Sequence, residues 1–259
     1  MSPPSAKSDQ QAGLRDARGR QWSAYSLTGP GKPVNADAFA VELTGESLAF
    51  VVADGVGAMA GSQLASRLAA KTAVDWIKRR TLVDTDGAGP LFAAVNSAVG
   101  EGLKARNMSG ATTMVVAAIA AGGAVVASVG DSEILAIDAT GPARSLAPAD
   151  HLPSQTNVLL SWLDGVEEFE PHTLALQSLP YRLCLVTDGV AGTLSYETIA
   201  DLVRSVRPAE AARLLVREAR AGGSRDDATA LVISNSVEED LRSGLIGRLR
   251  SLSALIWRK

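Results

Sequence analysis

Several features that mark familiar classes of binding protein are scarce or missing in this chain of 259 residues. It has one cysteine, so no internal disulfide can form, and with two histidines it lacks the Cys/His spacing of a zinc site. The net charge of -3 argues against nonspecific nucleic-acid binding. No apolar run approaches the roughly 18 residues of a transmembrane helix, and no apolar secretory segment opens the chain. These absences predict a cytoplasmic location.

Two common catalytic signatures are missing as well. The sequence contains neither a Gly-x-x-x-x-Gly-Lys-Ser/Thr phosphate loop nor a Gly-x-Ser-x-Gly nucleophile elbow. Aromatic residues make up only 4% of the chain, whereas 46% of all residues are hydrophobic. The chain can therefore bury a sizeable core, and that core is built mainly from alanine, valine, leucine and isoleucine.

What the sequence does contain is an apolar run that ends in an aspartate, and this arrangement recurs. Residues 48–53 run directly into Asp54 and Gly55, residues 183–187 into Asp188, and residues 125–129 reach Asp131 after one glycine. A short apolar run that ends at a turn signal is typical of a buried strand. An ordinary Asp-Gly turn would explain any one of these sites. Because the arrangement recurs at three strand ends, we expect the carboxylates to meet.

Periodicity divides the rest of the chain into further strands and helices. Strands are predicted at 22–27, 34–41, 111–119, 124–129, 133–137, 181–187 and 228–234, and the three between 111 and 137 are interpreted as an antiparallel meander. Helices are predicted at 62–80, from Pro90 onward, at 195–206 and from Pro208 to just before Gly222, with Ser62 as the N-cap of the first.

The same pattern predicts one domain with two appendages. Residues 1–20 are polar and are interpreted as a mobile leader, and residues 21–236 form a single α+β domain. Residues 237–259 read as a basic amphipathic helix with leucines and an isoleucine on one side. This helix either docks on its own domain or a neighbouring chain, or it contacts a partner or a membrane surface.

The strand-end aspartates favour a metal-dependent reaction. The set comprises Asp37, Asp54, Asp131, Asp188 and one of Asp226 and Asp227. Carboxylates gathered at one end of a sheet repel one another unless a cation lies between them. Hard divalent ions such as Mg and Mn prefer this all-oxygen environment. Two or more such ions would suit phosphoester hydrolysis, since they lower the pKa of a bridging water and neutralise the phosphoryl charge.

In their order along the chain, these motifs resemble the protein phosphatase 2C family of metal-dependent Ser/Thr phosphatases, in its compact bacterial form. Any single motif is weak, but six in the family's order over residues 22–235 make a strong resemblance. The motifs are Asn35-Ala-Asp37, Asp54-Gly-Val-Gly-Ala58, Gly110-Ala-Thr-Thr113, Val129-Gly-Asp-Ser-Glu133, Thr187-Asp-Gly189 and Ser224-Arg-Asp-Asp227.

The resemblance implies a fold and a division of roles. The fold is a four-layer α-β-β-α sandwich, with two antiparallel sheets flanked by helices and the metals at one end. Two Mg or Mn ions are implied, with a possible third, and a bridging hydroxide attacks the phosphorus of phosphoserine or phosphothreonine directly. The substrates are phosphorylated proteins, products of a partner Ser/Thr kinase. By motif position, the resemblance makes Asp54, Asp188 and Asp226 catalytic residues that hold one ion. The second ion is held by Asp54 and the Gly55 carbonyl, and Asp37 acts through a metal-bound water. Asp131 with Asp188 completes the site of the third ion.

Three positions depart from the family's pattern. Lys32 stands where an arginine often binds the substrate phosphate, Glu133 replaces an arginine, and Asp227 replaces an asparagine. Lysine offers a point charge in place of a planar fork, so it would hold phosphate less rigidly, or it is simply an exposed loop residue. Asp227 is interpreted as a capping group beside the ligand Asp226. The departures leave open an alternative, a catalytically weak pseudophosphatase that serves as a binding or regulatory module.

Overall fold

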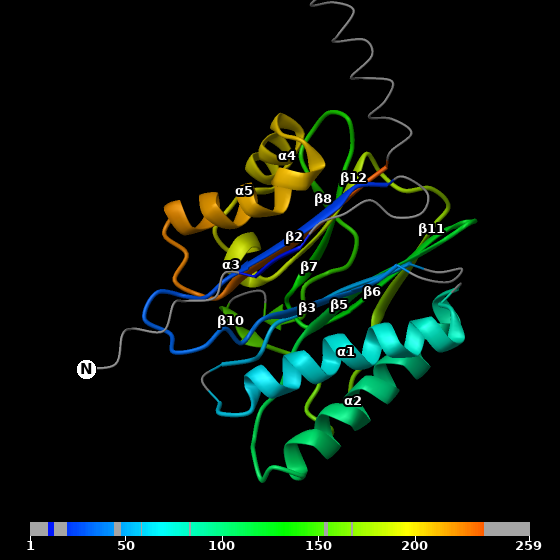
Figure 1. Cartoon of the computed structure of the whole chain (residues 1–259), viewed down its shortest axis with the longest axis vertical. Coiled ribbons are helices and arrows are strands. Elements are labelled where there is room, and N and C mark those ends of the chain that lie inside the picture. Colours follow the sequence, from blue (N-terminus) through cyan, green and yellow to red (C-terminus); the bar gives the residue numbers. More distant parts are fainter. Residues whose placement is uncertain are drawn as a thin grey trace, which may run out of the picture.

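Two antiparallel sheets stack face to face, and helices cover the outer face of each, so the chain has four layers (Figure 1). This confirms the fold class expected from the sequence. The computed structural model describes residues 10–12, 20–43, 48–57, 59–82, 84–152, 155–166 and 168–235. The predicted C-terminal helix at 237–259 lies outside them. Within these residues, no helix combines the length and the apolar character needed to cross a membrane.

The first sheet has six strands in the spatial order β1-β2-β13-β12-β7-β8, and the second has five in the order β11-β6-β5-β4-β3. Strands β9 (His151–Leu152) and β10 (Gln155–Leu159) pair with each other as a separate sheet. The first sheet is built from β1 (Gln10–Ala12), β2 (Trp22–Leu27), β7 (Glu133–Ile137), β8 (Arg144–Ser145), β12 (Arg182–Val186) and β13 (Ala228–Ser234). The second is built from β3 (Ala38–Glu42), β4 (Leu48–Ala53), β5 (Met114–Ala120), β6 (Gly123–Val129) and β11 (His172–Leu176).

The helices belong to two separate outer layers. Helices α1 (Ser62–Arg80) and α2 (Ala88–Lys104), the latter entered through a 3₁₀ turn, cover the five-strand sheet. Helices α4 (Tyr196–Ser205) and α5 (Pro208–Ala221) cover the six-strand sheet, and the short α3 (Asp188–Ala191) lies against β13. Each layer buries one face of its helices, as their three- and four-residue apolar spacing predicts.

Strand β4 shows why its sequence is apolar without interruption. Ala49 and Val51 belong to the core beneath α1 and α2, while Phe50 and Val52 belong to the core between the two sheets. Successive side chains of a strand point to opposite faces, so a strand covered on both faces needs apolar residues throughout. Between the sheets, the ring of Phe50 meets that of Trp22 edge-on, with 6.0 Å between centroids.

The predicted meander is wrong at its third strand. β5 pairs with β6, but β7 pairs with β12 in the other sheet, so the chain changes sheets after β6. Gly130 makes this change possible with a φ of 99°, and its missing Cβ leaves room for Thr113. The crossing places Asp131 in the connection between the two sheets. Alternating apolar runs do not show which sheet each strand joins.

Three smaller expectations also differ from the structure. The N-cap of α1 is Gly61, and Ser62 is the first helical residue, whose hydroxyl donates to the Val56 carbonyl at 2.6 Å. Strand β1 lies inside the segment assigned to a mobile leader and pairs with β2. Strand β11 forms the edge of the five-strand sheet in a segment for which no strand was predicted. The proline-rich surroundings of β11 masked its short alternating pattern.

Candidate active site

Asp54 leaves the end of β4 between the two sheets, and neighbouring backbone fixes its position. Its carbonyl accepts hydrogen bonds from the amide of Thr113 and the hydroxyl of Thr112, both at 2.8 Å. Its own amide donates to the Thr113 hydroxyl at 3.2 Å. These bonds tie the first residue after β4 to the residues that precede β5, so the Asp54 side chain is carried on rigid backbone.

Gly55 holds the tightest backbone approach beside this aspartate. A Cβ at this position would lie 2.7 Å from the Ser62 carbonyl oxygen and 2.8 Å from the Ala36 carbonyl oxygen. The Gly55 amide donates to the Ala36 carbonyl at 3.2 Å. The absence of a side chain therefore lets the Asp37 loop, the end of β4 and the start of α1 meet.

We expect Gly55→Ala to lower the free energy of unfolding by about 1–3 kcal/mol, because backbone atoms cannot move aside for the new methyl group. Chemical denaturation of the metal-free protein measures the change. Gly89→Ala is the matched control, since a Cβ there meets no atom within 4 Å. Equal stability of Gly55→Ala and the unmodified protein would contradict the close packing.

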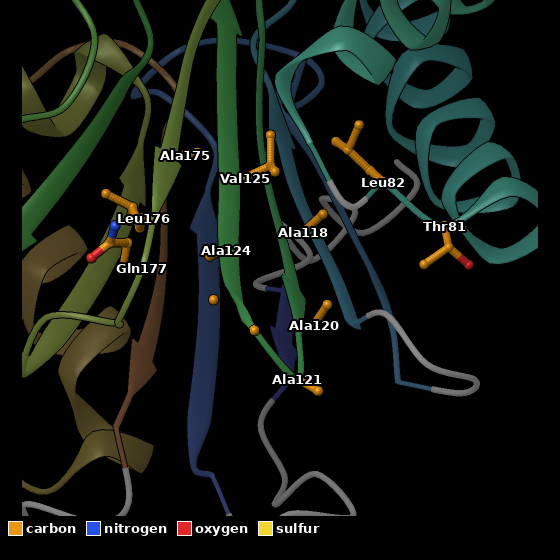
Figure 2. Close-up of a pocket in the computed structure, with 12 residues that line it drawn as sticks. Thr81, Leu82, Ala118, Ala120, Ala121, Ala124, Val125, Ala175, Leu176 and Gln177 are labelled. Atoms are coloured by element: carbon orange, nitrogen blue, oxygen red, sulfur yellow. The ribbon is translucent and has the colours of Figure 1, made fainter.

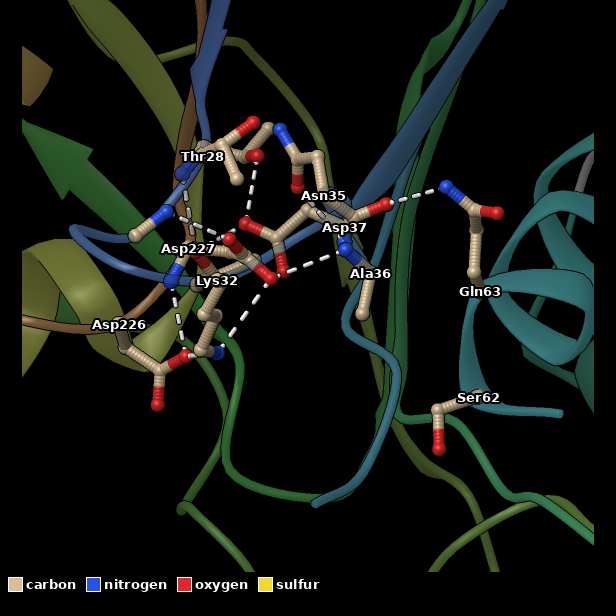
Figure 3. A network of polar contacts seen from close by, with 12 residues as sticks. Thr28, Lys32, Asn35, Ala36, Asp37, Ser62, Gln63, Asp226 and Asp227 are labelled. Carbon is tan, nitrogen blue, oxygen red and sulfur yellow. Dashed lines mark hydrogen bonds and ion pairs between the residues drawn. The ribbon is translucent and has the colours of Figure 1, made fainter. Parts of the chain in front are cut away.

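Asp37 is buried at 3% exposure and is held by hydroxyl groups from the opposite sheet. Its Oδ2 accepts hydrogen bonds from Thr229 at 2.6 Å and Thr187 at 3.1 Å. No hydrogen bond from the described residues reaches its Oδ1, which is also buried. The Asp37 amide donates to the Asn35 side chain at 2.9 Å, and Figure 3 shows this residue amid the polar network. One carboxylate oxygen is thus fixed, and the other has no described partner.

Asp188 opens α3 directly after β12 and approaches the loop before β13. A Cβ on the next residue, Gly189, would lie 2.0 Å from the Asp227 carbonyl oxygen, so only glycine permits this contact. The Asp188 Oδ1 is buried, and within the described chain no hydrogen bond satisfies it. The two strand ends therefore deliver Asp188 and the Asp226–Asp227 pair to the same place.

The carboxylates are close enough to shift one another's protonation. Burial, with smaller contributions from the charges of Asp227 and Asp188, raises the pKa of Asp37 to about 7. Burial raises the pKa of Asp54 well above its ordinary value, and the charges of Asp37, Asp188 and Asp131 act in the same direction. Burial, followed by the charge of Asp226, raises the pKa of Asp188. The structure thus brings together the strand-end aspartates as the sequence predicts.

Lys32 lies at the exposed edge of this cluster. Its ammonium group forms an ion pair with Asp226 and a second, at 3.4 Å, with Asp227 (Figure 3). Partial burial acts to lower the pKa of Lys32, but these ion pairs outweigh it and raise the pKa above the ordinary value. The side chain predicted to bind substrate phosphate is therefore at the site, where it neutralises part of the negative charge.

The two adjacent aspartates have different surroundings. Asp226 is half exposed at 49%, whereas Asp227 is buried at 1%. Asp227 accepts hydrogen bonds from the amide of Gly29 at 2.7 Å and from the amide of Ala36 at 2.9 Å. It therefore closes the loop between β2 and β3, and Asp226, which pairs with Lys32, is the more exposed of the two.

These surroundings predict a large effect on stability for one alanine substitution and a small effect for the other. Asp227→Ala leaves two backbone amides without their acceptor and is expected to reduce the free energy of unfolding by about 3 kcal/mol. Asp226→Ala is expected to change it by less than about 1 kcal/mol, since its ion pair with Lys32 is partly exposed. Urea unfolding of both variants in EDTA measures the difference. If only Asp226→Ala lost stability, Asp226 and not Asp227 would be the residue that closes the loop.

The donor set fits a divalent cation in its chemistry. The strand-end side chains that converge are carboxylates, and a hard ion would satisfy the buried Oδ1 atoms of Asp37 and Asp188. As the side chains stand, no three His, Cys, Asp or Glu residues of the described chain are arranged as a metal site. The ammonium of Lys32 accounts for part of this, because it already holds Asp226. Binding would require Asp226 to exchange that partner.

A hollow of about 650 Å³ lies elsewhere, beside the turn between β5 and β6 (Figure 2). Its wall consists of small and apolar residues with Thr81 and Gln177, and it contains no ionisable side chain. Asp54 lies at the opposite end of β4, whose start pairs with the end of β5. This hollow therefore lacks the groups needed for proton transfer or metal binding.

Comparison with known families agrees with this geometry. The family model described as protein phosphatase 2C matches residues 31–222. The chain belongs to the protein phosphatase 2C family. It is thereby assigned to the protein Ser/Thr phosphatases, which are phosphoric monoester hydrolases. The matched range contains Asp37, Asp54, Asp131 and Asp188 but ends before Asp226, so the last ligand of the proposed set lies beyond it.

Solved structures of the protein phosphatase 2C type show the same fold. The chain is 25% identical to the phosphatase MsPP from Mycobacterium smegmatis, with a TM-score of 0.71 over 82% of this chain and 97% of that one. It is 25% identical to PppA from Pseudomonas aeruginosa, with a TM-score of 0.70 over 86% and 99% of the two chains. The PstP catalytic domain, solved with two manganese ions, is 23% identical, with a TM-score of 0.71 over 83% and 97%. None of the curated proteins compared matches the sequence.

Sequence reasoning gave no role to two residues that the structure places at this site. Thr187 and Thr229 are fully buried and hold the Asp37 carboxylate. Thr187 precedes Asp188 in its motif, and Thr229 occupies the second position of β13. A buried threonine in an otherwise apolar strand was the available signal, since its hydroxyl needs a partner.

Proposed function

We propose that this phosphatase hydrolyses phosphoserine and phosphothreonine in proteins at a centre of two Mg or Mn ions, with a possible third. Asp54, Asp188 and Asp226 would hold one ion, and Asp54 with the Gly55 carbonyl the second. Asp37 would act at longer range through water, and Asp131 with Asp188 would complete the third site. The substrates would be proteins phosphorylated by a Ser/Thr kinase.

One observation carries this proposal. Carboxylates from both sheets meet at one end of the sandwich, with raised pKa values at Asp37, Asp54 and Asp188. Two of these side chains each have a buried oxygen that no hydrogen bond from the described chain satisfies. Such an arrangement is costly for a fold that does not bind cations, because like charges are held together out of water.

The chain's own residues supply binding and orientation. When bound, the cations would supply water of lowered pKa and neutralise charge on the phosphoryl oxygens, which would allow hydrolysis without a phosphoenzyme. Thr187 and Thr229 hold Asp37 through one of its oxygens, and the other accepts no hydrogen bond from the described residues. When Asp226 turns to its cation, the Lys32 ammonium group would exchange its ion pair with Asp226 for one with a phosphate oxygen.

A pseudophosphatase is the second candidate, because Lys32 and Glu133 replace arginines of the family's pattern. Glu133 accepts a hydrogen bond from the Tyr196 hydroxyl, and Lys32 pairs with Asp226. Both replacements therefore have local partners, and neither removes a carboxylate from the cluster. These contacts favour an active enzyme. The Lys32–Asp226 ion pair must break before either residue binds its ligand, which would slow turnover.

The two candidates differ in turnover. We expect the purified protein to release phosphate from an aryl phosphate and from a phosphothreonine peptide with Mn, and to release none with EDTA. Asp188→Asn is expected to lower kcat by about 10³-fold, because it removes a charge from the proposed cation site. Exposed Asp201→Asn is the matched control. Phosphopeptide binding without turnover in the unmodified protein would favour the pseudophosphatase.

A further inference from the structure

A second hollow opens directly beside the carboxylate cluster, between the Lys32 loop and the start of α1. Its volume is about 540 Å³, within the range of roughly 300–1,000 Å³ that is usual for ligand pockets. In Figure 3, Ser62 and Gln63 lie across from Lys32 and Asp227, on the two sides of this space. We call it the Val34–Met59 groove, and its wall contains Lys32, Pro33, Val34, Ala36, Gly57, Met59, Ala60, Ser62, Gln63, Asp226 and Asp227.

The Val34–Met59 groove is charged at one end only. Lys32, Asp226 and Asp227 belong to the carboxylate cluster, and the other lining residues carry no charge. Val34 is 50% exposed and Met59 is 41% exposed, although both are large apolar side chains. Exposed apolar side chains that gather in a hollow beside a reactive centre indicate a binding surface.

Hydrogen bonds fix the walls of this groove in advance. The Gln63 side chain donates to the Asn35 carbonyl at 3.0 Å, and the Ser66 hydroxyl donates to the Ala36 carbonyl at 2.5 Å. These bonds join α1 to the loop that carries Val34. The groove is therefore preformed, and a ligand would bind with little ordering of the chain.

We propose that the Val34–Met59 groove binds the residues next to the phosphorylated side chain and selects substrates with an aliphatic residue there. The inference rests on the proposed function. A phosphate bound by Lys32 and by the proposed cations would lie at the charged end of the groove, so the adjoining peptide would continue along its uncharged part. Val34 and Met59 offer an aliphatic side chain apolar contact, and they offer an acidic one no partner for its charge.

Phosphothreonine peptides that differ at one position test this selectivity. Leucine, alanine or glutamate is placed one or two residues before or after the phosphothreonine, and kcat/KM is measured with Mn. We expect leucine to exceed glutamate by about 10-fold at a position on one side, consistent with partial burial of one aliphatic side chain. Equal kcat/KM for all peptides would overturn the inference.

Lysine substitutions in the wall of the groove test whether the groove is the source of this selectivity. Val34→Lys and Met59→Lys are expected to reverse the preference from leucine toward glutamate, measured as the ratio of the two kcat/KM values. Leu174→Lys on β11 is the matched control, because Leu174 is also an exposed apolar side chain at 37% and lies outside the groove. It should keep the ratio of the unmodified protein. A shift in Leu174→Lys equal to those of the groove variants would also overturn the inference.

An aryl phosphate separates this inference from the proposed function, since it has no neighbouring residues to place in the groove. If the protein hydrolyses the aryl phosphate but has the same kcat/KM for all peptides, the role of the groove is refuted and the proposed function is not. No hydrolysis of aryl phosphate or peptide with Mn would refute both. Thermal melting of each variant shows whether it is folded, and a folded Met59→Lys protein with unchanged peptide preference would refute a role for that wall.

Discussion

Asp54→Asn is expected to lower manganese-dependent turnover by about 10³-fold while it raises the stability of the metal-free protein. Asparagine keeps the shape of the side chain but removes the charge that, in our proposal, is shared by two cations, and the loss of such a group weakens charge neutralisation in the transition state. In the metal-free protein the same charge is unfavourable, because burial and the charges of Asp37, Asp188 and Asp131 raise the Asp54 pKa.

Two measurements on one variant check this pair of opposite effects. The rate of aryl phosphate hydrolysis with Mn gives the loss of turnover, and urea unfolding in EDTA at pH 7.5 gives the change in stability. Asp138→Asn is the control, since its side chain is 61% exposed in an ion pair on the surface. Unchanged turnover in Asp54→Asn would refute the proposed role of Asp54 as the central metal ligand. A less stable metal-free variant would refute the repulsion among the carboxylates.

The free energy of unfolding of the metal-free protein is expected to fall as pH rises from about 4 to 7. The pKa of Asp37 is about 7 in the folded protein and 3.8 as the ordinary value, so the folded state holds the proton over a range in which the unfolded state has released it. Stability falls with pH wherever the folded state binds more protons. A shift of about three units corresponds to about 4 kcal/mol for this buried group. Asp54 and Asp188 act in the same direction.

Denaturant unfolding in EDTA at several pH values measures this slope, and Asp37→Asn serves as the control that removes one titrating group. The slope should be shallower in Asp37→Asn than in the unmodified protein. Added Mn should stabilise the protein more at pH 7.5 than at pH 5, because cations compete with protons for the same carboxylates. Stability that rises between pH 4 and 7 in the unmodified protein, relative to Asp37→Asn, would contradict the buried cluster.

Much of the site was predictable because its residues follow directly from local patterns. Asp54 and Asp188 each end an apolar run, and the strands at β4 and β12 form where those runs lie. A side chain placed one residue after a strand leaves the sheet at the strand's end, so the recurrence of this pattern predicted a meeting of carboxylates. The motif order then predicted the four-layer sandwich.

The pairing of the strands and the hydrogen-bond partners of the site residues were not predictable in the same way. The sequence between β5 and β7 alternates as in a simple meander, yet β7 crosses to the other sheet at Gly130. Likewise, Asp226 and Asp227 are adjacent and chemically alike, and the motif assigned their roles only by position. The amides of Gly29 and Ala36, which hold Asp227, come from a loop that is distant in sequence.

The sequence by itself therefore determined most of the strands and helices, the family resemblance and the set of aspartates, because each depends on residues close together in the chain. Only the tertiary structure decided which strands pair, that Thr187 and Thr229 hold Asp37, and that Lys32 neutralises Asp226. It also placed Val34 and Met59 on one groove. These features depend on contacts between both sheets and α1, and such long-range contacts leave no periodic trace in the sequence.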